Sequence, residues 1–205
     1  STQLAVIYLI GLYCADLLGT LDRAEYDAIL SELQRVPDKL EEILKDREDI
    51  QYFASLYFNR PSMFFIGRNL DYAVGLEGSL KLKEISYIHS EAYAAGELKH
   101  GTISLIEPGT LVVALAGCGP LFEKTVSNAV EVKSRGADVL GLTTRDRAAD
   151  LSRTADHVIS IPETHPMLLP SLAVVPMQLF AYYTALQRGC DIDKPRNLAK
   201  SVTEE

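Results

Sequence analysis

Four short apolar runs in the chain predict buried β-strands. They are SMFFIG, TLVVALAG, ADVLGLTT and HVISIP, and each ends on Gly, Thr or Pro. Helical patterns at 70–88, 120–135 and 167–187 lie between or after these runs. Buried strands that alternate with helices indicate a parallel sheet covered on both faces, so the predicted fold class is α/β with a doubly wound sheet. The stretch HSEAYAAGELKHG interrupts the alternation, and we expect it to add a short strand and a short helix.

The first 60 residues follow a different, all-helical pattern. Residues 2–20 read as one mostly buried helix, and Asp22 is a candidate N-cap for a second helix that runs to about Val36. Pro37 then suits the first turn of a further helical stretch. We therefore divide the chain into a helical segment at 1–60, an α/β part at 61–188 and a polar tail at 189–205.

Composition and charge exclude several classes of function. The net charge is −8 and no basic run occurs, which argues against nucleic acid as a partner. The uncharged stretch MLLPSLAVVPMQLFAYYTAL has two prolines and a Gln, and in this setting a buried helix is favoured over a membrane span. The three widely spaced cysteines form no CxxC motif, so we expect reduced thiols and a cytoplasmic protein.

The helix predicted at 70–88 carries charges in an unusual place. On a helical wheel, Leu76, Leu80 and Tyr87 share an apolar arc, and Glu84 falls near its middle with Lys81 close beside it. The opposite arc holds Gly75, Ser79, Lys83 and Ser86. A charge on a buried side must be paired, shifted in pKa or at work in a cleft. The wheel therefore predicts that Glu84 borders a cleft with Lys81, although a minor salt bridge remains the alternative.

Two further segments offer candidate chemistry. The turn ALAGCGPLFEK follows a predicted strand and opens a helix, so Gly117 and Gly119 could present backbone N–H groups to phosphate, or simply make a tight turn. His100 closes GELKHG, a turn bounded by glycines that suits the aiming of a side chain. Glu97 and His100 have the spacing of a metal pair, but the sequence offers no third ligand, so no metal site is predicted.

Two motifs carry a resemblance to a known family. LEGSLKLKEISYIHSEAYAAGELKHG and the terminal KPRNLAKSVT closely resemble the isomerase region of the glutamine–fructose-6-phosphate aminotransferases, or glucosamine-6-phosphate synthases. That region is built from two sugar-isomerase (SIS) lobes. The resemblance implies that 1–60 is the helical end of a truncated first lobe, 61–188 a second SIS lobe, and 189–205 a tail that completes the active site.

The resemblance also implies roles for particular residues. The family's proton-transfer carboxylate falls on Glu84 and its nearby lysine on Lys81. The histidine linked to sugar ring opening falls on His100, which in the family reaches the active site of the partner subunit. The lysine that forms a Schiff base with the open-chain sugar falls on Lys200, and Ala199 offers a backbone contact to the sugar. We expect the tail to fold over the sugar with Leu198 and Val202 buried, because such a lysine must be held rather than loose.

The reaction that the resemblance implies converts fructose 6-phosphate and ammonia to glucosamine 6-phosphate, with ammonia drawn from glutamine in the full enzyme. It needs no metal or redox cofactor, and the implied partners are a glutaminase domain and a second copy in a homodimer. The family's S-x-S-G-x-T phosphate loop and its glutaminase domain are missing from these 205 residues, so we expect the chain alone to be inactive. Asn69 also stands where the family usually has Gly.

Two other functions fit parts of the sequence. One is a non-catalytic SIS module that binds a phosphosugar and regulates a partner, but such a module would not need Glu84, His100 and Lys200 together. The other is a stand-alone phosphosugar isomerase, against which the PRNLAKS tail argues. The joint presence of these motifs favours the aminotransferase.

Overall fold

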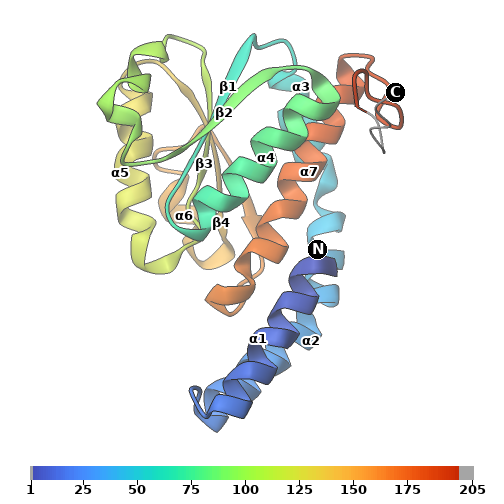
Figure 1. The fold of residues 1–205 in the computed structure, drawn as a ribbon. Helices are drawn as coiled ribbons and strands as arrows, with labels where there is room; N and C mark the ends of the chain where they lie inside the picture. Colours follow the sequence, from blue (N-terminus) through green and yellow to red (C-terminus); the bar gives the residue numbers. More distant parts are fainter. Residues whose placement is uncertain (1, 199–205) are drawn as a thin grey trace, which may run out of the picture.

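A single parallel sheet organises the chain in the computed structural model, which describes residues 2–198 (Figure 1). Its strand order is β2-β1-β3-β4-β5, and every neighbouring pair is parallel. The order reverses between β1 and β3, as in a doubly wound sheet. The strands are β1 Ser62–Gly67, β2 His89–Ala94, β3 Leu111–Leu115, β4 Asp138–Thr144 and β5 His157–Ile161. The predicted fold class and all four predicted strands are confirmed, and β2 is the expected additional strand.

Helices cover both faces of this sheet. One face packs against α3, α4 and α7, and the other against α5 and α6 (Figure 1). The α-helices are α1 Thr2–Leu18, α2 Arg23–Lys45, α3 Arg47–Tyr57, α4 Leu70–Ser86, α5 Phe122–Lys133, α6 Ala148–Leu151 and α7 Leu169–Gln187. Short 3-10 turns lie at η1 Leu98–His100, η2 Thr102–Leu105, η3 Gly119–Leu121, η4 Arg145–Arg147 and η5 Pro166–Leu168.

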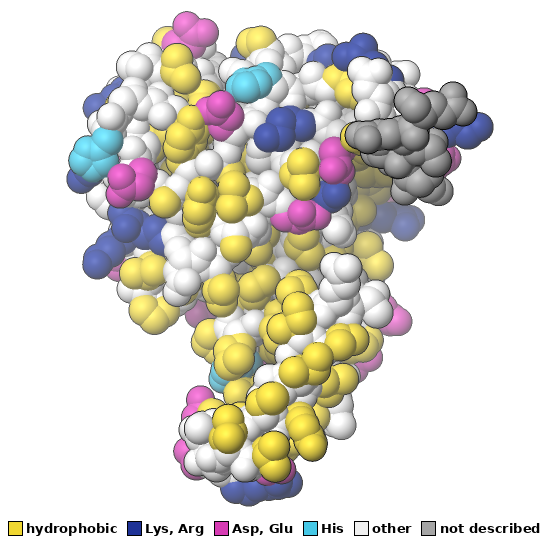
Figure 2. Space-filling model, in the orientation of Figure 1, with side chains coloured by type: hydrophobic (Ala, Val, Ile, Leu, Met, Phe, Trp, Pro, Cys, Tyr) yellow, Lys and Arg dark blue, Asp and Glu magenta, His cyan; other side chains and the backbone are white. Residues whose placement is uncertain are grey.

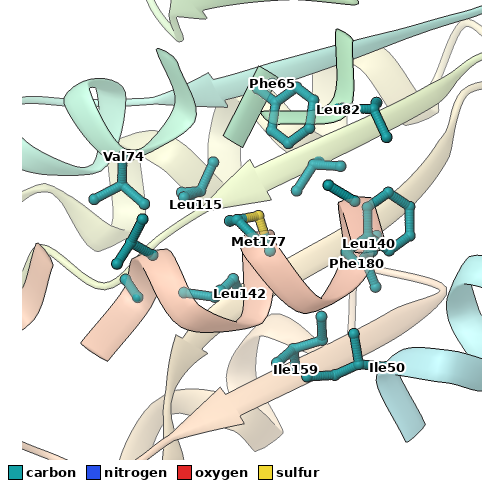
Figure 3. Close-up of a cluster of buried hydrophobic side chains, with 14 of the residues drawn as sticks. Ile50, Phe65, Val74, Leu82, Leu115, Leu140, Leu142, Ile159, Met177 and Phe180 are labelled. Carbon is teal, nitrogen blue, oxygen red and sulfur yellow. The ribbon is translucent and has the colours of Figure 1, made fainter. Parts of the chain in front are cut away.

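The core forms on both sides of the sheet because successive strand residues point to opposite faces. Phe65 and Leu115 pack with Met177 and Phe180 of α7 on one face (Figure 3). The neighbouring strand residues, Phe64 among them, pack against α5 and α6 on the other. All five residues of β3 are buried, which explains why its sequence is uniformly apolar rather than alternating.

The buried face of α4 differs from the wheel. Gly75, Gly78 and Ser79 are buried, whereas Leu76 and Leu80 are 47% and 43% exposed. A Cβ at Gly78 would lie 3.1 Å from Phe65 Cε1 and 3.2 Å from Met177 Cβ. The small residues let α4 approach α7 and β1 closely. Gly75, Ser79 and Ser86, which the wheel places opposite the apolar arc, are therefore buried, and the wheel is wrong about this side of the helix.

The helical leader departs from prediction at two points. Leu12 is the single buried residue of α1, so the expectation that residues 2–20 form a mostly buried helix is wrong. Asp22 caps α2 as expected, with its carboxylate accepting a hydrogen bond from the Glu25 N–H at 2.8 Å. Pro37 lies inside α2 rather than at the start of a new helix, and the chain breaks instead at Asp46. Apolar positions at 29, 36 and 43 continue along one face of α2 and pack inward on either side of the proline.

The apolar C-terminal helix is a core element. Pro166–Gln187 is the one stretch within the described residues long and apolar enough to cross a membrane, and 56% of its most apolar window is buried inside the fold. Its neighbours are α3 and α4. The sequence expectation of a buried helix agrees with this packing.

Candidate active site

Glu84 and Lys81 form an ion pair on α4. The Lys81 ammonium donates to Glu84 Oε2 at 2.7 Å and lies 3.6 Å from Glu77 Oε1. Both side chains of the close pair are about two-thirds buried, with 31% of Lys81 and 27% of Glu84 exposed. The hydrogen bond to Glu84 raises the pKa of Lys81, with a further contribution from the charge of Glu77, while partial burial opposes the rise. The two charges therefore hold each other in place without leaving solvent.

An open hollow of about 510 Å³ lies beside Glu84. It is bounded by the last turn of α4, the start of β2 and the tail, and its lining residues are Leu80, Lys83, Glu84, Tyr87, Ile88, His89, Arg196, Asn197 and Leu198. Lys81 lines a separate hollow of about 400 Å³ between α4 and α7, so the ion pair stands between the two. Leu198 is 54% exposed at the rim, which corrects the expectation that it is buried.

The remaining predicted residues are not gathered at this hollow. His100 ends η1, is exposed, and is not among the residues that line it. Ala199, Lys200 and Val202 lie outside the described residues. No group of three or more His, Cys, Asp or Glu side chains within residues 2–198 is placed to hold a metal ion.

A buried carboxylate occupies the point where the strand order reverses. Asp71, in the first turn of α4, is 1% exposed, and its Oδ2 accepts a hydrogen bond from the Cys118 N–H at 2.8 Å. Its Oδ1 has no hydrogen-bond partner in the described part of the chain. Burial raises the pKa of Asp71 to about 6, although the N–H groups of Cys118 and Gly117 oppose the rise. The backbone N–H of Cys118 in the turn after β3 is thus already bound to a carboxylate of the chain itself. This favours the interpretation of the turn as a tight strand-to-helix connection over a phosphate site.

A larger hollow lies elsewhere but offers less chemistry. It measures about 610 Å³, between α2 and the segments that follow β4 and β5. Most of its charged side chains are engaged with each other, since Lys39 pairs with Glu32 and Arg145 donates to Glu42 at 2.7 Å. This network ties α2 to the sheet and leaves the hollow beside Glu84 as the better candidate site.

Comparison with known families accounts for the fold. Residues 56–188, well over half of the chain, match the model of the SIS domain. The chain belongs to the SIS domain family. The doubly wound sheet with α4 and α7 packed on one face is therefore the SIS fold in this protein.

Relatives within the SIS family match the whole chain. It is 55% identical over 205 residues to a glutamine–fructose-6-phosphate aminotransferase (isomerizing) of Caldanaerobacter subterraneus, and 45% identical to one of Methanosarcina acetivorans. The chain covers 34% and 33% of these relatives, and so spans about a third of their length. Among solved structures, the C-terminal domain of a glucosamine-fructose-6-phosphate aminotransferase from Francisella tularensis superposes with a TM-score of 0.90 at 32% identity, covering 95% of this chain and 55% of that one.

Sequence reasoning missed two residues near these features. Asp71 reads as an ordinary acidic residue in a first helical turn, and only the approach of the β3 turn shows that it is buried. The helical wheel places Tyr87 on the apolar arc, yet this residue ends α4 with a left-handed backbone at φ 61° and faces the hollow. A bulky residue at positive φ cannot be recognised from hydropathy.

Proposed function

We propose that this chain is the C-terminal isomerase part of a glutamine–fructose-6-phosphate aminotransferase. The full enzyme would convert fructose 6-phosphate and ammonia to glucosamine 6-phosphate. The observation that carries the proposal is a mostly buried carboxylate, Glu84, at a hollow bordered by the tail, in a chain 55% identical to a relative of that name. Residues 1–60 would complete a first SIS lobe, 61–188 form the second, and 189–205 complete the site.

The proposed roles follow from the chemistry of each group. Glu84 moves a proton between C1 and C2 of the open-chain sugar, which a carboxylate within hydrogen-bond reach can do. Lys81 orients that carboxylate through its 2.7 Å hydrogen bond and adds positive charge near the developing oxyanion. Lys200 forms an imine with the C2 carbonyl before ammonia displaces it, and Ala199 contacts the sugar through its backbone. His100 assists ring opening in the neighbouring subunit of a homodimer.

The exposed apolar surface of α1 supports the division into lobes. Ile7, Ile10, Tyr13 and Leu17 are all more than half exposed, and apolar side chains gather along this helix in Figure 2. A stable fold rarely leaves such a helix uncovered. In the proposed enzyme, the rest of the first lobe covers it.

Fructose 6-phosphate also needs an anion site, and among residues 2–198 the edge of the sheet where such a site would form is already occupied. The switch point between β1 and β3 already holds the Asp71 carboxylate. The phosphate would therefore bind in the first lobe, and residues 1–205 alone should show no appreciable turnover.

We further propose that the enzyme works in the cytoplasm, in keeping with its three free cysteines.

Borohydride trapping tests the proposal. The full-length protein that contains this chain is incubated with fructose 6-phosphate, reduced, and mapped by peptide mass spectrometry, while glucosamine 6-phosphate formation from glutamine is assayed in parallel. We expect a sugar adduct on Lys200, loss of aminosugar formation in Lys200→Arg, and wild-type activity in the tail control Lys194→Arg. An adduct on another lysine, or an active Lys200→Arg enzyme, would contradict the role of Lys200. Absence of any aminosugar product would contradict the proposed function itself.

A further inference from the structure

The last turn of α4 carries a residue that links Glu84 to the tail. Tyr87 lies three positions after Glu84 and lines the same hollow. Its backbone is left-handed, with φ 61° and ψ 19°, where a bulky side chain is uncommon. This backbone conformation ends α4, and the Tyr87 ring contacts the tail.

One tail residue contacts both ends of the Tyr87 side chain. The Arg196 backbone N–H donates to Tyr87 Oη at 2.9 Å, and the Arg196 guanidinium lies 4.1 Å from the centroid of the same ring. The hydrogen bond fixes the main chain and the cation–π contact fixes the side chain. The two contacts act on different groups, so each can be removed separately.

A second anchor holds the beginning of the tail on the same turn of α4. Arg188 Nε donates to the Ser86 carbonyl at 2.8 Å, and its Nη1 donates to the Phe58 carbonyl at 2.9 Å. Between the anchors, Asp191 Oδ1 accepts from the N–H groups of Asp193 and Lys194 and forms a local turn. The segment 188–196 is therefore attached to the end of α4 at both of its ends.

We propose that Tyr87 is a positioning residue for the sugar reaction, because it fixes Arg196 and with it the place from which the last residues of the chain start. The proposal rests on the function proposed above. Lys200 lies four positions after Arg196, a span of at most about 14 Å, and Glu84 lies about one helical turn before Tyr87. Holding Arg196 on Tyr87 keeps the attachment point of Lys200 within reach of the carboxylate.

The first experiment tests the contact without any assumption about activity. Trypsin cleaves after Arg196 only when its guanidinium leaves the Tyr87 ring. We expect Tyr87→Leu in the 205-residue chain to raise the cleavage rate after Arg196 at least about threefold relative to cleavage after Arg153, whose side chain is 79% exposed on the far face of the sheet. Tyr26→Leu is the matched control, because Arg23 lies 5.0 Å from the Tyr26 ring on the distant α2. Circular dichroism verifies that each variant is folded.

The second experiment tests the effect on the reaction in the full-length protein. We expect Tyr87→Leu to lower kcat for aminosugar formation at least tenfold, with KM for fructose 6-phosphate within about threefold, and to lower the yield of the borohydride adduct on Lys200 in parallel. Tyr87→Phe keeps the ring and loses only the hydroxyl, so its kcat should lie between wild type and Tyr87→Leu. Tyr26→Leu should retain wild-type kcat.

The outcomes separate this proposal from the proposed function. If Tyr87→Leu is folded and cleavage after Arg196 is unchanged, Tyr87 does not hold Arg196 and the proposal is wrong. If cleavage rises while kcat and adduct yield stay at wild-type levels, Tyr87 holds Arg196 but does not position Lys200 for the reaction. That result also overturns the proposal. If the wild-type protein makes no aminosugar, the proposed function fails first, whatever the proteolysis shows, and the positioning role fails with it.

Discussion

The Lys81 ammonium lies between two carboxylates of its own helix, 2.7 Å from Glu84 and 3.6 Å from Glu77. The closer partner faces the hollow that the tail borders. Lys81 thus restricts the rotamers of Glu84, at the place where a proton-transfer group would need a fixed direction.

Removing the closer carboxylate should weaken the fold slightly, and mainly below about pH 10. The hydrogen bond to Glu84 raises the pKa of Lys81, so its stabilising contribution is complete below about pH 10 and disappears as the pH rises through the elevated value. We expect Glu84→Gln to lower the free energy of unfolding by about 0.5 kcal/mol at pH 8 and by less above pH 11. Urea unfolding at several pH values measures this. An equal loss at pH 8 and above pH 11 would contradict it.

The burial of Asp71 predicts that the free energy of unfolding depends on pH for a different reason, since here burial and not an ion pair raises the pKa. Its folded pKa of about 6 exceeds the ordinary value near 4, so between these values the native chain holds the proton that the unfolded chain releases. The free energy of unfolding therefore falls as the pH rises through this window. Relative to wild type, Asp71→Asn should gain about 2 kcal/mol between pH 4 and pH 7 and then remain level. A difference that is flat, or that shrinks toward pH 7, would show that the buried carboxylate is not the cause.

The close contact of α4 with α7 should be sensitive to a single methyl group. Gly78→Ala places a Cβ against Phe65 and Met177, and we expect a loss of about 1–3 kcal/mol in the free energy of unfolding. Gly11→Ala is the matched control, because that glycine lies inside α1 with nothing within 4 Å of its Cβ position. The control should be neutral or gain up to about 1 kcal/mol from helix propensity. Equal effects of the two substitutions in urea unfolding would refute the packing role of Gly78.

Asn69 should be a site of relievable strain. Its backbone, at φ 54° and ψ −124°, suits glycine, and its side chain makes no capping hydrogen bond to α4. Asn69→Gly should therefore raise the free energy of unfolding by about 1 kcal/mol. Asn59→Gly, at an exposed asparagine without positive φ, should be neutral or destabilising. Thermal unfolding compares the two, and a loss of stability in Asn69→Gly would contradict the strain.

Much of the fold was readable because burial on both faces leaves a simple signal. Strands such as LVVAL are apolar throughout, and the segments between them have helical spacing. The orientation of α4 could not be predicted, because a helical wheel takes the side with the most hydrophobic residues as the buried side. Gly78 and Ser79 are buried because they are small, and Leu80 is left outside. Pro37 was equally misleading, since the packing of α2 continues across it.

The candidate site was predictable only in part, for a similar reason. Glu84 and Lys81 are neighbours in one helix, so their pairing follows from local spacing. The contact between Tyr87 and Arg196 joins residues 109 positions apart and depends on the path of the tail. The burial of Asp71 depends likewise on a turn that arrives 47 positions later.

The exchange of sugar protons with solvent tests the central claim most directly. In deuterium oxide, the full-length protein should catalyse the incorporation of solvent deuterium into the sugar as the proton moves between C1 and C2 of fructose 6-phosphate. Proton NMR of the sugar follows the rate. We expect Glu84→Gln to slow this exchange at least about 100-fold, while Glu77→Gln, which removes the more distant carboxylate beside Lys81, stays within about threefold of wild type. Wild-type exchange in a folded Glu84→Gln protein would contradict the assignment of Glu84 as the proton-transfer group.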